Sequence, residues 1–466
     1  MRDSRTGLPV FVGLAAGVAL YYYTDWLPLV VLGGLVFLAL AWIRLDLALV
    51  FILFSAPFYR FPKTFGSAEF TLTESLVLAC FVAWASRRLY QRFTAGDWGL
   101  DLPSGWRPWT SPAGFFLAVA TVSLLFSQYL HVSLREYRVE IIEPLLFYLM
   151  LLSALRGERA VWRMANAFVL LGVGVSIFAL YHYFFIGIVE NTGGVQRMLG
   201  IYHSPNALGL FLGRVAPVAL ALGLRRRDAK YTRSPLSVRI RMWMDGRGPG
   251  WPHLVAVPLI GASLLLSFSR GAWLGAMVGF ALIAAFRGRR ALLALAGGAA
   301  VALLAAIPFH GLGRLVSDVT TEQRLYVWQA ALRIIADHPL TGVGLDNFLY
   351  YYRERGYMLP EAWAEPDVSH PHNLLLDFWT RLGVLGLASL VWLQLSFWRR
   401  GLRLHAALKG RSLQFVALAL MASMADYLVH GMLDNSYFLI DMAIVFWFTY
   451  GLMEVMGKEV APEGAP

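Results

Sequence analysis

Ser369-His370-Pro371-His372-Asn373 closes the largely polar segment 309–371 and is followed at once by the apolar run 374–382 and by Gly383-Val384-Leu385-Gly386. Such a run predicts a helix that enters a membrane, so the two histidines fall where the membrane surface meets water. Because histidine titrates near neutral pH, a histidine at this boundary is either a helix-start residue or a catalyst. The rest of the sequence has to distinguish these two roles.

The composition indicates a polytopic membrane protein. Hydrophobic residues make up 58% and charged residues 15% of the 466 residues, and this much apolar surface does not fit inside one soluble core. The single Cys80 lies in an apolar run, which excludes an internal disulfide framework and a cysteine-rich metal site. The net charge of +11 is concentrated in short loops, which indicates membrane topology rather than binding to nucleic acid.

Apolar runs recur along the whole chain and predict up to 14 membrane-spanning helices. The runs are residues 8–23, 26–42, 45–58, 72–85, 112–129, 141–155, 161–185, 207–224, 253–268, 271–286, 292–308, 374–397, 413–433 and 437–455. Several are close to the lower length limit of about 17 residues for a spanning helix.

The basic residues orient these helices. Lysine and arginine in short loops stay on the cytoplasmic side, so the most basic segment, residues 225–247, is expected in the cytoplasm, with both termini also inside. The loops that carry Arg197 and His203, the turn at Arg270 and the segment 309–371 then face the extracytoplasmic side. The few charged residues of that side therefore converge on one surface.

Residues 309–371 are expected to form one large, partly helical extracytoplasmic loop. The stretch 323–336 has a helical pattern, and Asp337-His338-Pro339 ends it because proline cannot continue a helix. Its apolar stripe, expected to lie on the membrane or on the bundle, consists of Leu325, Trp328, Leu332 and Ile335, with Arg324 off the stripe. The tyrosines of residues 348–352 fit an interfacial anchor or a platform for sugar rings.

Arg197 is a candidate phosphate ligand in the loop before the eighth span. The same loop also has a purely structural interpretation, in which Asn206 starts the following helix. The functional interpretation is that the guanidinium of Arg197 presents its fixed fork of donors to a phosphate. Taken alone, the loop does not decide between the two.

Arg270 is the second candidate, in the tight turn Ser269-Arg270-Gly271 between two spans. An arginine at this position needs an anionic partner. The partner is either a ligand or an internal carboxylate such as Glu143 or Asp434. Because Gly271 lets the backbone approach closely, the sequence favours a ligand.

His372 is the candidate base. A lone histidine at a helix boundary is more often structural, but two arginines on the same face favour catalysis. A base that titrates near neutrality, beside cations that bind an anionic leaving group, is what glycosyl transfer from a lipid diphosphate requires. His370 and His338 both precede proline and are interpreted as turn residues.

Four charged residues within the spans are expected to have structural partners. Asp377 and Arg381 lie four residues apart on one helix and are expected to pair with each other. Arg214 and Asp426 lie inside spans, where an unpaired charge is costly, so each requires a partner that the sequence does not name.

The motifs resemble those of the bacterial O-antigen ligases. His372-Asn373, nine residues, Gly383, two residues and Gly386 match the histidine motif of that family. Residues 197–206, Ser269-Arg270-Gly271, residues 324–328 and residues 337–344 are similar to the remaining landmarks of the wider O-antigen ligase and polymerase superfamily. The resemblance extends over residues 161–455.

This resemblance implies an all-α polytopic membrane protein, a GT-C-type glycosyltransferase with about 12–14 transmembrane helices and one large helical extracytoplasmic loop. The apolar runs divide the chain into N-terminal helices (1–160), central helices with the Arg197 and Arg270 loops (161–308), the extracytoplasmic loop (309–371) and C-terminal helices (372–466). The implied location is the bacterial inner, or cytoplasmic, membrane, with the active site on the extracytoplasmic side.

The implied reaction moves a glycan from undecaprenyl diphosphate to an acceptor hydroxyl, on lipid A core or another glycan, with inversion. By resemblance His372 is the general base, Arg197 and Arg270 bind the diphosphate, and Arg324, His203, Asn206, Asn373 and Asp434 support them. Family members of this kind work without a metal, and the sequence has no Asp-x-Asp pair. A glycan polymerase of the same superfamily and, from another class, a membrane transporter remain alternatives.

Overall fold

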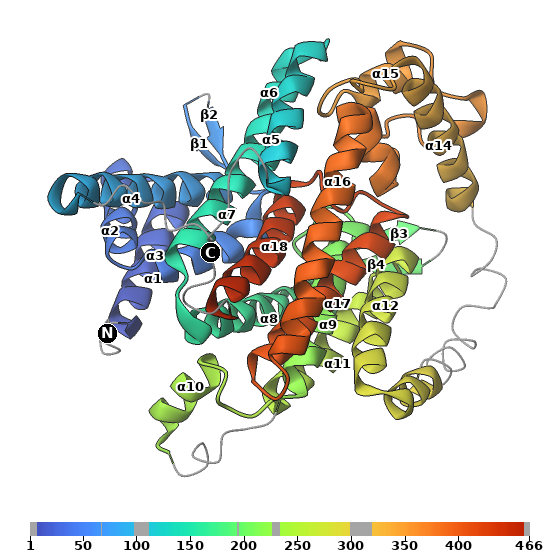
Figure 1. Cartoon of the computed structure of the whole chain (residues 1–466). Helices are drawn as coiled ribbons and strands as arrows, with labels where there is room; N and C mark the ends of the chain where they lie inside the picture. Colours follow the sequence, from blue (N-terminus) through green and yellow to red (C-terminus); the bar gives the residue numbers. More distant parts are fainter. Residues whose placement is uncertain are drawn as a thin grey trace.

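The computed structural model describes residues 7–66, 68–96, 111–192, 195–225, 234–298 and 319–460. Helices dominate this part of the chain, and its strands form two short antiparallel hairpins, β1–β2 and β3–β4 (Figure 1). The predicted all-α fold is confirmed.

The described elements occur in the following order along the chain. The N-terminal part contains α1 (Gly7–Tyr23), α2 (Leu27–Ile43), α3 (Leu45–Ser55), η1 (Ala56–Phe58), β1 (Lys63–Phe65), β2 (Ala68–Phe70), α4 (Leu72–Ala95), α5 (Pro112–Ser123), η3 (Leu124–Phe126), α6 (Leu130–Glu136), η4 (Tyr137–Ile142), α7 (Glu143–Ala154), α8 (Gly157–Tyr181) and η5 (His182–Ile186). The C-terminal part contains β3 (Val189–Thr192), β4 (Val195–Met198), α9 (Pro205–Gly223), α10 (Leu236–Met244), α11 (Trp251–Leu266), α12 (Arg270–Arg287), α14 (Val319–Asp337), α15 (Phe348–Glu354), η7 (Pro360–Ala362), α16 (Leu374–Ala407), α17 (Leu413–Gly431) and α18 (Ile440–Val460).

Six helices of the described chain are long and apolar enough to cross a membrane, namely α8 with η5, α9, α12, α16, α17 and α18. Five shorter apolar helices accompany them: α1, α2, α3 with η1, α5 and α11. The protein is therefore a multi-pass membrane protein. Most of the predicted span 292–308 lies outside the described residues, as do residues 309–318 of the predicted loop.

Helices α9, α12 and α17 pack closely through small residues. A Cβ on Gly213 of α9 would lie 2.6 Å from Oδ1 of Asp426 in α17, so only glycine permits this approach. Arg214 of α9 is buried beside it and donates to the hydroxyls of Ser423 (3.0 Å) and Thr449 (3.1 Å). The partners that Arg214 requires are thus hydroxyl groups of α17 and α18.

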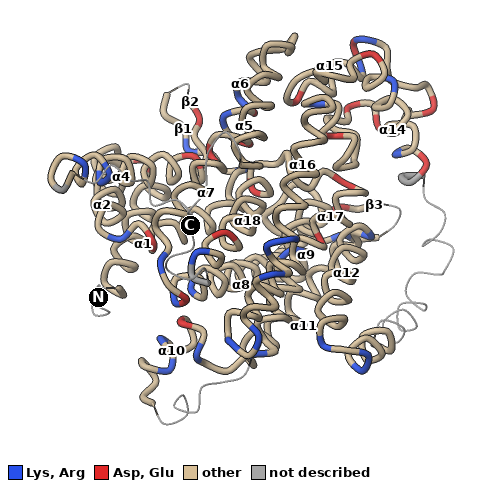
Figure 2. The backbone as a smooth tube through the Cα atoms, in the orientation of Figure 1, with Lys and Arg blue, Asp and Glu red and all other residues tan. Residues whose placement is uncertain are grey.

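The distribution of basic residues assigned each loop to the cytoplasmic or the extracytoplasmic side. In the structure these two sets of loops lie at opposite ends of the helix bundle. Loops assigned to the extracytoplasmic side meet at one end, where the Tyr59 hydroxyl lies 3.0 Å from Nδ1 of His203. Loops assigned to the cytoplasm meet at the other end, where Nε1 of Trp162 donates to Oγ of Ser412 (3.3 Å). In Figure 1, α14 and α15 lie at the top and α10 at the bottom, and Figure 2 shows lysine and arginine gathered around α10 and the lower ends of α11 and α12.

Helix α16 is broken at Gly383, which has φ +69° and ψ −168°. The break frees backbone carbonyls, and the Thr380 carbonyl accepts a hydrogen bond from the Val343 N–H (2.8 Å). Three backbone hydrogen bonds in all join the segment 339–344 to residues 380–384. A Cβ on Gly383 would lie 2.1 Å from the Leu340 carbonyl oxygen. Glycine is required here by its φ angle and by the close approach of the docked segment.

The buried face of helix α14 matches the predicted apolar stripe only in part. It ends at Asp337, as His338-Pro339 predicts, but Leu325 and Leu332 of the expected apolar stripe are 48% and 53% exposed. The buried apolar face consists of Val327, Ala330, Ala331, Ile334 and Ile335, of which Ile335 belongs to the predicted stripe. Of the two predicted surfaces for the stripe, the bundle and the membrane, the bundle covers Ile335 but not Leu325 or Leu332, because the small residues Ala330 and Ala331 allow closer packing.

Candidate active site

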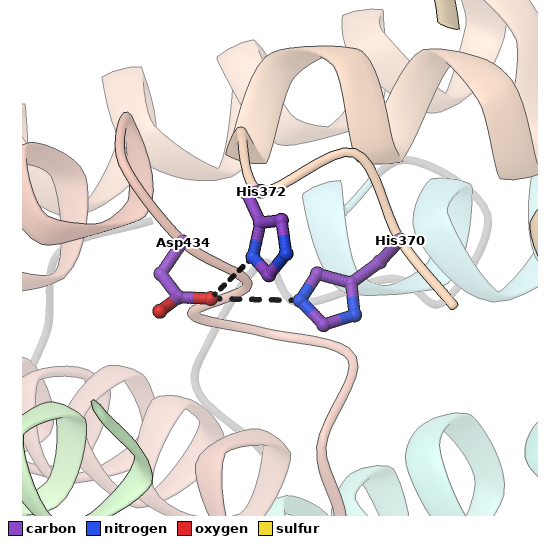
Figure 3. Close-up of side chains that lie close together, drawn as sticks. All are labelled: His370, His372 and Asp434. Carbon is purple, nitrogen blue, oxygen red and sulfur yellow. Dashed lines mark hydrogen bonds and ion pairs between the residues drawn. The ribbon is translucent and has the colours of Figure 1, made fainter. Parts of the chain in front are cut away.

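His372 and Asp434 form the centre of the candidate site. Nδ1 of His372 lies 3.0 Å from Oδ1 of Asp434, which is in the loop between α17 and α18 (Figure 3). Asn373 caps α16, because its Oδ1 accepts two N–H groups of the first turn. Its Nδ2 donates to the carbonyl of Met432 (3.1 Å). Asn373 therefore holds the start of α16 against the loop that carries Asp434.

The electrostatics of the pair fix its proton positions. Burial opposes ionisation of Asp434, but the nearby His370 and His372 and the charge of Arg324 hold the pKa of its carboxyl well below the usual value. An ionised carboxylate only accepts hydrogen bonds, so Nδ1 of His372 carries the proton and Nε2 keeps a free lone pair. Burial and then the neighbouring His370 lower the pKa of His372. At neutral pH the imidazole is thus uncharged and can act as a base.

Two further side chains surround Asp434. Nε2 of His370 lies 3.5 Å from Oδ1, and the Arg324 guanidinium of α14 lies 3.8 Å from Oδ2. The His370 ring packs edge-on to that of His372, with centroids 4.4 Å apart, so His370 is more than the turn residue that the sequence indicated. The ligand atoms of His370, His372 and Asp434 lie within 4.8 Å of one another, and by donor type they match a metal-ligand set.

Backbone strain marks both candidate segments. Among the described residues three that are not glycine have positive φ, and two of them are His372 and Phe268, each at +49°. An L-residue in the left-handed region costs about 1–3 kcal/mol, and such residues cluster at functional sites. Phe268 leads directly into Ser269 and Arg270. The surrounding structure therefore holds both the candidate base and the Arg270 turn in unusual backbone conformations.

Arg197 in β4 is held by three acceptors. Its guanidinium donates to Oε1 of Glu190 (3.0 Å), to Oδ1 of Asn206 (2.9 Å) and to the Ser267 carbonyl (3.1 Å). Ser267 lies just before the turn that carries Arg270. Arg197 therefore joins the β3–β4 hairpin to that turn, and the two candidate phosphate ligands lie on segments in direct contact.

The structural interpretation of the sequence had Asn206 starting helix α9, but the residue that caps this helix is a different one. Ser204 rather than Asn206 caps the helix, because its Oγ accepts a first-turn N–H (3.1 Å). Asn206 instead holds Arg197. His203 is hydrogen-bonded to Tyr59; burial lowers its pKa, and the carboxylate of Asp434 opposes that shift. His203 thus lies within electrostatic range of Asp434.

Arg270 is exposed and is the first residue of α12. A Cβ on the following Gly271 would lie 2.8 Å from Cδ2 of His430, so the start of α12 packs directly on the last turn of α17. Asp434 follows that turn. The glycine therefore brings the Arg270 turn against the segment that leads into the His372 partner.

The other charges in the spans differ in their contacts, and neither carboxylate oxygen of Asp426 has a hydrogen-bond partner in the described part of the chain. Asp377 and Arg381 are both buried and pair at 2.7 Å, as predicted. Glu143, which the sequence offered as a partner for Arg270, lies 3.9 Å from Arg138.

Comparison with known proteins agrees with the motifs. Residues 255–391 match the family model described as O-antigen ligase, a region that contains Arg270 and His372 but neither Arg197 nor Asp434. A curated O-antigen ligase from Salmonella typhimurium (strain LT2) is 30% identical over 143 residues, which are 28% of this chain and 35% of that relative. The chain thus spans about a third of the relative's length. The histidine motif and the Arg270 turn both lie inside the matched region, so this part of the chain is similar to the O-antigen ligases.

Proposed function

We propose that the protein is an integral-membrane glycosyltransferase that moves a glycan from undecaprenyl diphosphate to an acceptor hydroxyl on lipid A core. The observation that carries this proposal is the hydrogen-bonded pair of His372 and Asp434 at the same end of the bundle as Arg197 and Arg270. A neutral base at the same end of the bundle as these cations suits attack by a hydroxyl and departure of a diphosphate. The name of the Salmonella relative supports the ligase reaction.

The proposed chemistry proceeds by a single displacement. Nε2 of His372 takes the proton of the acceptor hydroxyl while its oxygen bonds to the anomeric carbon, from the face opposite the diphosphate. The bond between that carbon and the diphosphate oxygen breaks with its electron pair on the oxygen, so the configuration inverts. Arg197 and Arg270 neutralise the leaving diphosphate, and Asp434 stabilises the imidazolium that forms.

The proposal assigns charge neutralisation to arginine rather than to a metal ion. The guanidinium of Arg197 is held in one plane by acceptors on three segments, which preorganises its donors for phosphate oxygens. The proposed location is the bacterial inner membrane with His372 on the extracytoplasmic side, since the most basic loops lie at the other end.

The test reconstitutes the purified full-length protein in liposomes with an undecaprenyl-diphosphate-linked glycan and lipid A core. We expect glycan transfer to lipid A core that persists in EDTA, with inversion at the anomeric carbon detected by NMR. Loss of transfer in EDTA would contradict the metal-independent chemistry. A parallel reaction without lipid A core distinguishes the polymerase alternative, because extension of the lipid-linked glycan there would replace the ligase assignment.

A pair of histidine variants tests the base. His372→Ala should lose transfer, whereas His338→Ala, which removes another loop histidine before a proline, should retain it. His338 packs edge-on to Tyr351, with centroids 5.3 Å apart, and does not contact Asp434. Transfer by His372→Ala at the rate of the unmodified protein would remove the base assignment.

A further inference from the structure

A cavity of about 520 Å³ lies among α3, α4, α7 and α8, away from the candidate active site. Arginines from three separate segments line it: Arg44, Arg87, Arg88, Arg156, Arg159 and Arg163. Nothing in the proposed glycosyl transfer uses this cavity.

Two helices place the cavity at the opposite end of the bundle from His372. Helix α3 begins at the cavity and leads through η1 to Tyr59, which contacts His203. Helix α8 also begins at the cavity and leads through η5 to the hairpin that carries Arg197. With 25 residues α8 is about 37 Å long, which is enough to separate the two ends by the thickness of a membrane.

The charges of the cavity are strongly unbalanced. Asp46 is the one acidic side chain among the residues that line it; it lies 2.9 Å from Arg44 and 3.4 Å from Arg163. Arg159 reaches a second carboxylate outside the lining, Asp245, at 3.8 Å. The first turns of α3 and α8 add the positive ends of two helix dipoles. Arginines and helix N-termini therefore face one space with a large excess of positive charge.

A buried donor provides an independent indication of a ligand. Trp84 lines the cavity, and its Nε1–H is buried without a hydrogen-bond partner in the described part of the chain. Buried N–H groups in native proteins are nearly always paired, so this one calls for an acceptor. Basic residues that only determine topology would be dispersed along solvated loops. Here three segments bring them to one concave site beside an unpaired indole.

We propose that this cavity binds the phosphate of an anionic membrane phospholipid. Guanidinium groups match phosphate oxygens in charge and geometry, and the unpaired indole N–H supplies a further donor. The cavity has the volume of a small-ligand site and lies at the ends of membrane helices, where lipid headgroups are. Basic pockets between transmembrane helices on the cytoplasmic side bind such headgroups.

Native mass spectrometry of the detergent-purified full-length protein tests the proposal, with titrations of phosphatidylglycerol and of zwitterionic phosphatidylcholine. We expect saturable binding of phosphatidylglycerol with clear preference over phosphatidylcholine. The double variant Arg87→Gln/Arg88→Gln should weaken this binding roughly thirtyfold. The matched double variant Arg289→Gln/Arg290→Gln removes two adjacent arginines outside the cavity and should bind like the unmodified protein. Equal binding of the two lipids, or equal weakening in both double variants, would overturn the proposal.

Two further arms identify the ligand source and guard against misfolding. Trp84→Phe keeps the ring and removes only the N–H, so phosphatidylglycerol binding should weaken several-fold at an unchanged melting temperature. Unchanged affinity in Trp84→Phe would contradict the role of the indole. Soluble glycerol phosphate should not displace the lipid at equal concentration. Displacement by it would overturn the lipid assignment in favour of a soluble phosphate.

Discussion

The two ends of the bundle use arginine in different ways. At the end with His372, Arg197 lies 3.0 Å from Glu190 and Arg324 lies 3.8 Å from Asp434. At the other end six arginines line one cavity in which Asp46 is the one acidic side chain. Near His372 these arginines each lie beside a carboxylate, whereas in the cavity arginines outnumber carboxylates and the net charge is positive. The first arrangement suits chemistry on one substrate, and the second suits retention of a lipid.

The variant with the largest expected effect, His372→Ala, should affect glycan transfer at one end of the bundle and not lipid binding at the other. His372→Ala should lower the rate of glycan transfer by about 10²–10⁴-fold, because the acceptor hydroxyl loses its base. Phosphatidylglycerol binding should be unchanged, since the arginine cavity lies at the opposite end. Single-turnover transfer and native mass spectrometry on the same preparation measure both. Loss of lipid binding together with transfer would indicate general misfolding rather than a missing base.

Asp434→Asn should lower the transfer rate by about 10²-fold, because the amide no longer fixes the Nδ1–H tautomer of His372. The carboxylate raises the pKa of His372, so its removal lowers that pKa further. The acidic limb of the pH–rate profile should therefore move to lower pH. A limb that stays in place or moves to higher pH would contradict the role of Asp434.

Gly383→Ala tests the backbone that supports the site. The new Cβ would collide with the Leu340 carbonyl and occupy a positive φ, so we expect a loss of about 2–4 kcal/mol in the free energy of unfolding. Gly356→Ala is the matched control, because Gly356 also has positive φ but no atom within 4 Å; it should cost about 1 kcal/mol. Thermal denaturation in detergent compares them, and equal losses would contradict the importance of the docked segment.

Arg197→Lys should weaken binding of the undecaprenyl diphosphate donor about tenfold, because lysine cannot reproduce the planar fork. Arg353→Lys is the control, since Arg353 forms an exposed ion pair with Asp367 and should bind the donor normally. Donor titration by native mass spectrometry checks both. If Arg197→Lys leaves donor affinity intact while Arg87→Gln/Arg88→Gln reduces it, the donor diphosphate binds in the arginine cavity and not at the end with His372.

The smallest effect is the pH dependence of the unmodified enzyme. Protonation of His372 as pH falls through its pKa removes the base, and that pKa lies below the ordinary value of 6.5. Transfer should therefore change less than about twofold between pH 7.5 and pH 6.5 and fall only at lower pH. A rate that already halves well above pH 6.5 would indicate a different base.

Hydropathy predicted where helices begin better than where they end. Helices α5, α16 and α17 begin at residues 112, 374 and 413, as the apolar runs indicated. Helix α16 continues to Ala407, past the last apolar residue of its run, because basic side chains end a hydrophobic segment without ending a helix. The short helix α6 and the two hairpins lack long apolar runs, so that signal could not detect them.

The sequence identified the members of the candidate site but not their contacts. Asp434 and Arg324 were expected to support His372, yet the pairing of His372 with Asp434 joins residues 62 positions apart and depends on the packing of α16 against α17. Glu190, the partner of Arg197, was missed. The adjacent Gly193-Gly194 is a hairpin signal that places residue 190 opposite residue 197, and that register is the one observed.

The break at Gly383 also constrains how the extracytoplasmic loop can evolve. Residues 339–344 supply hydrogen bonds that another turn of α16 would otherwise make, so they belong structurally to that helix although they precede it by thirty positions or more. Lengthening or deletion inside this segment would leave main-chain carbonyls unsatisfied at the membrane boundary. Relatives with larger or smaller loops should therefore keep the length of this segment and differ elsewhere in the loop, where the chain can change length without opening α16.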